Sequence, residues 1–296
     1  MRAAAAFLSG SKSRFLSFDR GSWFIRLLKD PAGLAGLTIL VVVVVISVFP
    51  TQLAPHDPLE PTRNTFATPS LIHPFGTDNL GRDELSRIIY GARSSMQVAS
   101  TAILMAIVLG SVIGLVSGYV GGWLDLLSQR IVDAWQAFPT LILAIAIVSV
   151  FRPGIWTVAI AIGTTMTPGI VRVVRSSTIT QKNLAYIEAA VVIGVPQWKI
   201  LTRHILPNIT APILVLGSVD IGTAILAEAS LGFLGIGVAP PAISWGSMLS
   251  RTGLKFLETA PMLAVYPGLA IGLTVFGVNI LGDALRDVLD PRLRQR

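Results

Sequence analysis

Long stretches of this chain carry few or no charged side chains, and that pattern restricts the possible folds more than any other feature. A helix needs about 20 mostly apolar residues to cross the hydrocarbon core of a bilayer. Backbone groups in lipid must be paired within their own segment, so helices are the default, and the run Val41–Val45 does not alternate as a barrel strand would. We therefore expect an all-α membrane protein with six transmembrane helices, within residues 31–56, 94–124, 134–151, 153–171, 211–229 and 259–282.

Composition excludes a soluble globular domain. Of the 296 residues, 52% are hydrophobic and 13% are charged, against about 25% charged in a typical soluble protein. Most of the 23 Lys and Arg residues fall on one side of the predicted membrane if both termini are cytoplasmic. The positive-inside rule thus predicts cytoplasmic termini, and it explains the net charge of +7 without nucleic acid.

The predicted spans divide the chain into segments. We expect residues 79–93 to form a short interfacial helix, and the Gly- and Pro-rich stretch 231–250 to be a re-entrant or mouth-lining loop. The segments are a cytoplasmic N-terminal segment (1–30), a first span (31–55), an extracytoplasmic segment (56–93), a five-span core (94–282) that contains a cytoplasmic loop (172–210), and a cytoplasmic tail (283–296).

Two features bear on the packing of the spans. Gly110, Gly114 and Gly118 recur every fourth residue, which lets helices approach closely. Packing within the chain is favoured slightly over a subunit interface. Pro168 lies well inside the fourth span, where it removes a backbone hydrogen bond and predicts a kink.

Residue types needed for several chemistries are missing or dispersed. The chain has no cysteine, and its three histidines (His56, His73 and His204) are scattered along the sequence, so we expect no metal or catalytic site. No Gly-x-x-x-x-Gly-Lys-Ser/Thr loop is present, so the chain should not bind ATP itself.

The loop 172–210 is the most informative segment. It reads as a helix, a break at Gly194 and a second helix, with Pro196 in the first turn of the second helix and Pro207 ending it. Such an elbow is either a docking element or a plain connector between spans. The candidate docking residues of this loop are Glu188, Ala189, Ala190, Gly194, Pro196, His204, Leu206 and Pro207.

A series of motifs resembles one family in order and spacing. Glu-Ala-Ala, then Gly, then Leu-Pro is similar to the coupling loop of ABC importer permeases. From about residue 73 to 292, the chain resembles the C-type permease subunit of dipeptide/oligopeptide (peptide/nickel) importers, whereas the first 30 residues match no such motif. The further motifs are His73-Pro74-Phe75-Gly76-Thr77-Asp78, Leu80-Gly81-Arg82-Asp83, Ala137-Phe138-Pro139, Ser244-Trp245-Gly246 and Leu281-Gly282-Asp283.

This resemblance implies a function and a set of partners. The chain would form half of the translocation path of an ATP-driven peptide importer in the inner (plasma) membrane, with a type I ABC importer permease fold. Glu188, Ala189, Ala190 and Gly194 would meet an ATPase. The implied partners are a B-type permease, two ATPase subunits or domains that hold ATP and Mg, an extracytoplasmic peptide-binding protein and membrane lipid; no cofactor is expected in this chain.

Alternatives remain at this stage. The same family includes nickel importers, and an ion-driven secondary transporter would find its best support in Pro168 and Asp220. A membrane enzyme lacks any nucleophile–base set. Asp220 and Glu228 share a broad face of the fifth span and, with Pro168 of the fourth span, could line the translocation path. Either carboxylate could instead be structural, paired with an arginine or a backbone group, and this is favoured for Glu228.

Overall fold

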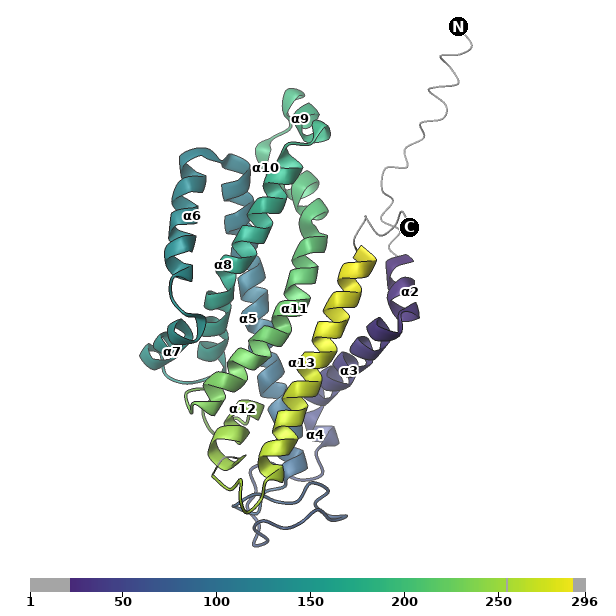
Figure 1. Ribbon diagram of the computed structural model, residues 1–296, viewed down its shortest axis with the longest axis vertical. Helices are drawn as coiled ribbons and strands as arrows, with labels where there is room; N and C mark the ends of the chain where they lie inside the picture. Colours follow the sequence, from purple (N-terminus) through teal and green to yellow (C-terminus); the bar gives the residue numbers. More distant parts are fainter. Residues whose placement is uncertain (1–21, 254, 290–296) are drawn as a thin grey trace.

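Helices make up every regular element in the part of the chain that the structure describes. This computed structural model describes residues 22–253 and 255–289 (Figure 1). The helices are α2 (Ser22–Lys29), α3 (Pro31–Val48), α4 (Pro50–Leu53), α5 (Glu84–Val120), α6 (Gly122–Gln136), α7 (Thr140–Val150), α8 (Ile155–Lys182), α9 (Ala185–Val192), α10 (Gln197–Lys199), the π-helix η1 (Ile200–Ile205), α11 (Leu206–Phe233), α12 (Trp245–Met248), the π-helix η2 (Leu249–Gly253) and α13 (Met262–Leu289).

Five helical segments are long and apolar enough to cross a membrane. They are α3, α5, α8, the continuous run Gln197–Phe233 and α13. Helices α6 and α7 together could supply a sixth span, but they are bent by 85° relative to each other. The predicted all-α membrane fold is confirmed, with five or six candidate spans.

Local sequence signals set where the span helices begin and end. Asp30 caps α3 by accepting a hydrogen bond from the Gly33 amide at 2.9 Å, and Pro31 fills the first turn. Asp83 caps α5 in the same way, through the Ser86 amide at 2.8 Å. At the other end of α5, Gly121 adopts φ 70° and stops the helix.

The predicted interfacial helix over residues 79–93 is wrong. Residues from Glu84 onward are the first turns of α5, which runs unbroken for 37 residues. The charges that argued against a continuous helix are satisfied locally: Arg87 lies 3.5 Å from Asp78, 4.0 Å from Glu84 and donates to the Pro58 carbonyl. A partnered charge at a helix end does not interrupt the helix.

The predicted span over residues 134–151 is broken in the structure. Helix α7 has only 11 residues, and the chain turns sharply between Gln136 and Thr140. Pro139 has no amide hydrogen, and it disfavours a helical conformation at Phe138. The proline therefore breaks an apolar stretch that hydropathy alone reads as continuous.

Close packing between α5 and α8 forms the centre of the bundle. A Cβ built on Gly114 would lie 2.7 Å from the carbonyl oxygen of Val171, and one on Gly110 would lie 2.7 Å from the Ile170 side chain. The glycine stripe therefore serves packing within the chain, as favoured from the sequence. Pro168 is buried within α8.

The segment 231–250 forms no membrane-spanning helix of its own, in agreement with the prediction of a loop. After α11 it turns back, and the short helix α12 packs against the end of α11: a Cβ on Gly246 would lie 2.7 Å from Ala229 backbone atoms. Ser244 caps α12 through a reciprocal pair of hydrogen bonds with Ser247.

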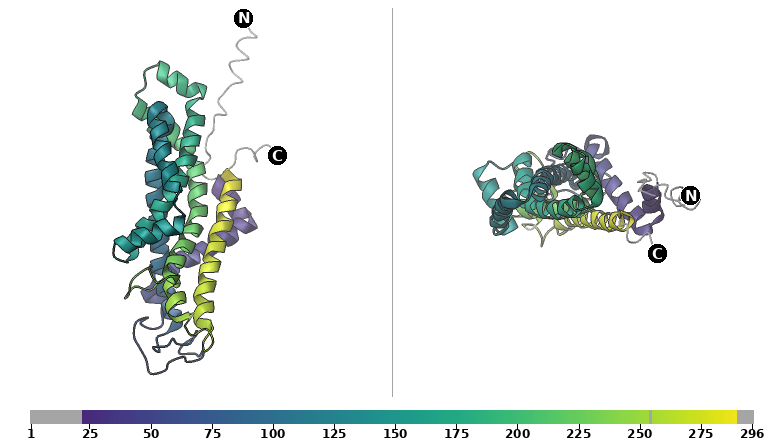
Figure 2. Two further views of the ribbon diagram at one scale, coloured as in Figure 1. Left: turned by 60° about the vertical axis from the view of Figure 1, so that its left-hand side comes forward. Right: turned by 90° about the horizontal axis from the view of Figure 1, so that it is seen from above.

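Helix α9 and the long loop before α5 lie at opposite ends of an elongated bundle. In Figures 1 and 2, α9 and α10 project at the upper end, whereas the long loop between α4 and α5 lies at the lower end with α12. Helices α6 and α7 lie on the opposite side of the bundle from α2 and α3. The described end of α13 and helix α2 lie toward the same end as α9.

Candidate functional site

The candidate site is the elbow formed by α9, α10 and η1, between α8 and α11. Its two arms are held together by an apolar cluster in which Ile187 and Ala190 of α9 meet Ile200 and Ile205 of η1. All four side chains are buried. The elbow is therefore a packed unit rather than a loose connector.

The break in the elbow is a Schellman motif. Gly194 has φ 77°, its amide donates to the Val191 carbonyl at 3.0 Å, and the Val195 amide donates to the Ala190 carbonyl at 3.0 Å. This left-handed position favours glycine because it carries no Cβ. Glycine at 194 thus fixes the angle between the two arms, as the sequence predicted.

The outer face of the elbow is apolar and exposed. Val192 is 85% exposed and Ile193 is 78% exposed, and Trp198 on the second arm is 59% exposed. Glu188 and Ala189 share this exposure, but Ala190 does not, because it belongs to the apolar cluster. Exposed apolar side chains at the tip of a projecting element mark a surface that another protein can cover.

Two prolines act differently from the sequence-based expectation. Pro196 precedes α10 as its capping residue, one position before the first turn. Pro207 does not end the second helix: η1 passes directly into α11, and Pro207 occupies the first turn of α11. Pro207 follows directly after the π-helical turn η1, where the regular i→i−4 hydrogen-bond ladder is already altered, so the missing proline amide does not end the helix. His204 lies half-buried in η1 and Leu206 opens α11.

A tyrosine links the elbow to the spans on both sides. The Tyr186 hydroxyl donates to Gln181 of α8 at 3.0 Å and accepts from Asn208 of α11 at 3.2 Å. Burial raises the pKa of the Tyr186 phenol, and the hydrogen bond from Asn208 opposes that shift. Sequence motifs gave no signal for Tyr186, whose role depends on residues 22 positions apart.

The predicted carboxylates of the fifth span lie in different surroundings. Glu228 is fully buried, and its Oε2 accepts a hydrogen bond from the Ser95 hydroxyl of α5 at 2.8 Å. The Ser95 hydroxyl also accepts from the Trp245 amide at 3.2 Å, so the carboxylate joins α5, α11 and α12. Its partner is a hydroxyl instead of the arginine or backbone group expected. Asp220 is half-buried in the middle of α11.

Two small cavities lie between the long loop after α4 and the segment before α12. The first has a volume of about 230 Å³ and the second about 270 Å³. They share Leu59, Pro241, Ala242 and Ile243, and the arginines Arg82 and Arg87 line the first. This end of the bundle is therefore hollowed.

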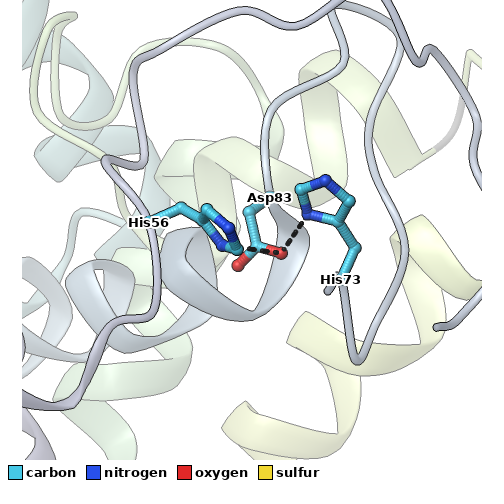
Figure 3. A group of neighbouring side chains, drawn as sticks. All are labelled: His56, His73 and Asp83. Carbon is cyan, nitrogen blue, oxygen red and sulfur yellow. Dashed lines mark hydrogen bonds and ion pairs between the residues drawn. The ribbon is translucent and has the colours of Figure 1, made fainter. Parts of the chain in front are cut away.

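The histidines are not as scattered as the sequence suggested. His56 and His73 have ring centroids 4.8 Å apart, and both rings lie next to Asp83 (Figure 3). His73 is buried. The long loop brings together residues that are 17 positions apart, which spacing alone could not show. His204 lies in the elbow instead, within η1.

Two family descriptions match the chain. Residues 106–295 match the binding-protein-dependent transport system inner membrane component family. Residues 21–71 match the N-terminal TM domain of oligopeptide transport permease C. The second match includes residues 21–30, so the expectation that the first 30 residues match nothing is corrected in part.

Curated relatives agree with both matches. The dipeptide transport system permease protein DppC of Alkalihalophilus pseudofirmus is 42% identical over 272 residues, which cover 92% of this chain and 89% of the relative. A glutathione transport system permease protein, GsiD of Escherichia coli, is 42% identical and covers 86% and 84%. DppC of Escherichia coli is 41% identical and covers 90% and 91%.

Solved structures show the same fold. An inward-facing conformation of the MetNI methionine ABC transporter aligns with a TM-score of 0.58 at 16% identity, over 69% of this chain and 97% of that one. A second crystal form gives a TM-score of 0.57 at 17% identity. The chain therefore belongs to the family of binding-protein-dependent transport system inner membrane components, as a multi-pass permease subunit of an ABC importer in the inner membrane.

Proposed function

We propose that this subunit forms half of the path for dipeptides or oligopeptides and docks on an ATPase through the α9–α10 elbow. The observation that carries the coupling role is the exposed apolar face of Val192, Ile193 and Trp198 on an otherwise packed elbow. Exposed apolar side chains are common where lipid covers a span, but α9 lies beyond the span helices (Figure 1). A protein partner explains this surface better than lipid does.

The packing of the elbow supports the idea that α9, α10 and η1 move as one rigid unit. The Schellman turn at Gly194 and the apolar cluster fix α9 against η1, and η1 continues into α11 without a break. A force on α9 would thus pass directly to a span helix. Glu188 lies exposed beside the apolar face and is placed to meet a basic group of an ATPase.

The proposed orientation places the elbow and both termini in the cytoplasm. The long loop between α4 and α5 and the hollowed end near α12 then face outward, toward an extracytoplasmic peptide-binding protein. The assembly holds a second, different permease and two ATPase subunits or domains, and ATP and Mg bind to those ATPases. Asp220 lies on the path within lipid-embedded α11, whereas the buried Glu228 is structural.

Peptides are proposed as substrates over nickel because of the relatives. Those described above are named as dipeptide and glutathione permeases. ATP-dependent uptake of a labelled dipeptide and of radioactive nickel, measured side by side in vesicles with the complete transporter, tests this choice. Nickel uptake without dipeptide uptake would reverse the assignment, and uptake driven by an ion gradient without ATP would favour a secondary transporter.

The elbow is tested by placing charge on its apolar face. Ile193→Asp should strongly reduce copurification of the ATPase and abolish ATP-dependent uptake, because a carboxylate buried in an apolar interface is costly. Leu71→Asp is the matched control, since Leu71 is equally apolar and fully exposed but lies in the loop after α4. Normal ATPase copurification with Ile193→Asp would refute the docking role.

A further inference from the structure

Three side chains from separate parts of the chain meet at the start of α5. His56 follows α4, His73 lies in the long loop, and Asp83 is the capping residue of α5 (Figure 3). The His73 Nδ1 atom lies 2.9 Å from Asp83 Oδ1, and the His56 Nδ1 atom lies 3.8 Å from the same oxygen. One ligand atom from each residue lies within 4.8 Å of the others.

The two oxygens of Asp83 have separate surroundings. Oδ2 accepts hydrogen bonds from the Ser86 amide at 2.8 Å and from the Ser86 hydroxyl at 2.7 Å. Oδ1 faces the two imidazoles (Figure 3). The helix cap therefore holds the carboxylate in a fixed orientation and leaves one oxygen directed at both histidines.

The spacing of these atoms suits a small tetrahedral metal ion. With bonds of about 2.0–2.2 Å, two ligand atoms on tetrahedral zinc lie about 3.4 Å apart. The two distances to Oδ1, 2.9 and 3.8 Å, fall on either side of that value. We propose that His56, His73 and Asp83 bind a divalent zinc-type ion at the start of α5.

Burial and access fit this assignment. Asp83 and His73 are buried, and packing thus holds two of the three ligands in place. The His56 side chain is 38% exposed, so an ion reaches the site from that side and a water molecule completes its coordination. The Ser86 bonds to Oδ2 orient the ligating carboxylate, as partners of metal ligands commonly do.

The competing explanation is a simple hydrogen bond between His73 and Asp83, and it does not involve the His56 ring. The His73–Asp83 hydrogen bond at 2.9 Å needs no other ring. At 3.8 Å, His56 is too far from Oδ1 to form a hydrogen bond. A metal ion would account for both imidazoles being directed at one oxygen.

The ion would close the long loop at its base. Residues 57–72 lie between two of the ligands, and the third ligand caps the 37-residue helix α5. A bound ion therefore holds this loop against α5. Its role is structural, and it is distinct from any transported substrate.

The test measures zinc bound by the assembled transporter, purified without a polyhistidine tag and treated first with a chelator. Wild type should bind one more zinc ion per copy of this chain than the His56→Gln variant does. Zinc sites in the other subunits are the same in both complexes and do not affect this difference. Loss of an outer partner alone costs about 10- to 100-fold in metal affinity, and loss of a ligand should cost at least about tenfold. His204→Gln is the matched control, because His204 lies in the elbow at the other end.

His56→Gln is the informative variant because it leaves the His73–Asp83 hydrogen bond in place, so it should fold. As a second readout, zinc should slow tryptic cleavage at the exposed Arg63 in wild type but not in His56→Gln. Cobalt in place of zinc should give the visible absorption of a tetrahedral site. Equal zinc binding by wild type and His56→Gln, or equal loss in His204→Gln, would overturn the proposal.

Discussion

Glu228 shows how one side chain can organise three helices. It is fully buried, and its link to Ser95 and from there to the Trp245 amide connects α11, α5 and α12. A buried carboxylate that loses its hydrogen-bond donor is costly, because its desolvation is no longer offset. The Ser95 hydroxyl therefore contributes more than a typical serine on a span helix.

Ser95→Ala should destabilise the transporter by about 1–3 kcal/mol, since it removes the donor to Glu228 and an acceptor for Trp245. Ser100→Ala is the control, because the exposed Ser100 hydroxyl bonds only to the Gln97 carbonyl of its own helix. Thermal denaturation of the purified complex in detergent compares the two. Equal melting temperatures would show that the buried link is dispensable.

Substitution of Asp220 should affect transport instead of stability. It is half-buried in the middle of α11, where an ionisable residue is a functional candidate by default. Asp220→Asn should change specific uptake several-fold while the amount of assembled complex stays near that of wild type. Uptake per unit of complex in membrane vesicles measures this. Unchanged specific uptake together with less complex would assign a structural role instead.

Single residues were predictable from the sequence where the reason for them is local. Gly194 sits at a turn that its immediate neighbours define, and the structure places it there. The link from Ser95 to Glu228 joins residues 133 positions apart, and the meeting of His56 with Asp83 depends on how a long loop folds back. Spacing in the chain carries no information on such contacts.

At the scale of elements, α5 and α8 have the most extensive contact of any helix pair in the described part of the chain. Gly114→Val should destabilise the chain by about 1–3 kcal/mol, because the added Cβ alone would lie 2.7 Å from the Val171 carbonyl oxygen and 2.8 Å from the Val174 Cβ. Gly169→Ala is the control: it lies on α8 with nothing within 4 Å of the added Cβ. The yield of folded protein and its melting temperature provide the comparison. Equal stability of the two variants would contradict this account of the packing.

Helices were predictable from the sequence where the length of an apolar run alone determines them. Helix α3 is free of charged residues and was expected. The start of α5 was missed because Arg87 lies among apparent loop residues, although Asp78 and Glu84 neutralise it in the fold. The bend between α6 and α7 was missed because hydropathy gives no weight to a single proline.

On the scale of the whole molecule, the described part of the chain presents an apolar lateral surface between its two ends. Only 17% of the residues in the α3 span are buried within the chain. Lipid or another subunit therefore covers the rest of this helix. The family pairs such a permease with another permease and with ATPases. The assembly, rather than this chain, is thus the functional unit.

We expect one copy of this chain in the transporter, paired with a different permease of similar fold. The match of residues 21–71 to the N-terminal TM domain of oligopeptide transport permease C motivates this expectation. Native mass spectrometry of the complex purified from membranes gives the stoichiometry directly. A stable transporter with two copies of this chain and no second permease would exclude the pairing.

The unbroken run Gln197–Phe233 gives the molecule a mechanical lever. At 1.5 Å per residue its 37 residues extend about 55 Å, so a tilt of about 5° at one end displaces the other by about 5 Å. One end is fused to the elbow, and the other abuts α12, where a Cβ on Gly232 would lie 2.8 Å from Gly246. If the elbow has the coupling role proposed above, a small rotation of it would move the far end of this helix by a distance comparable to the width of a peptide backbone.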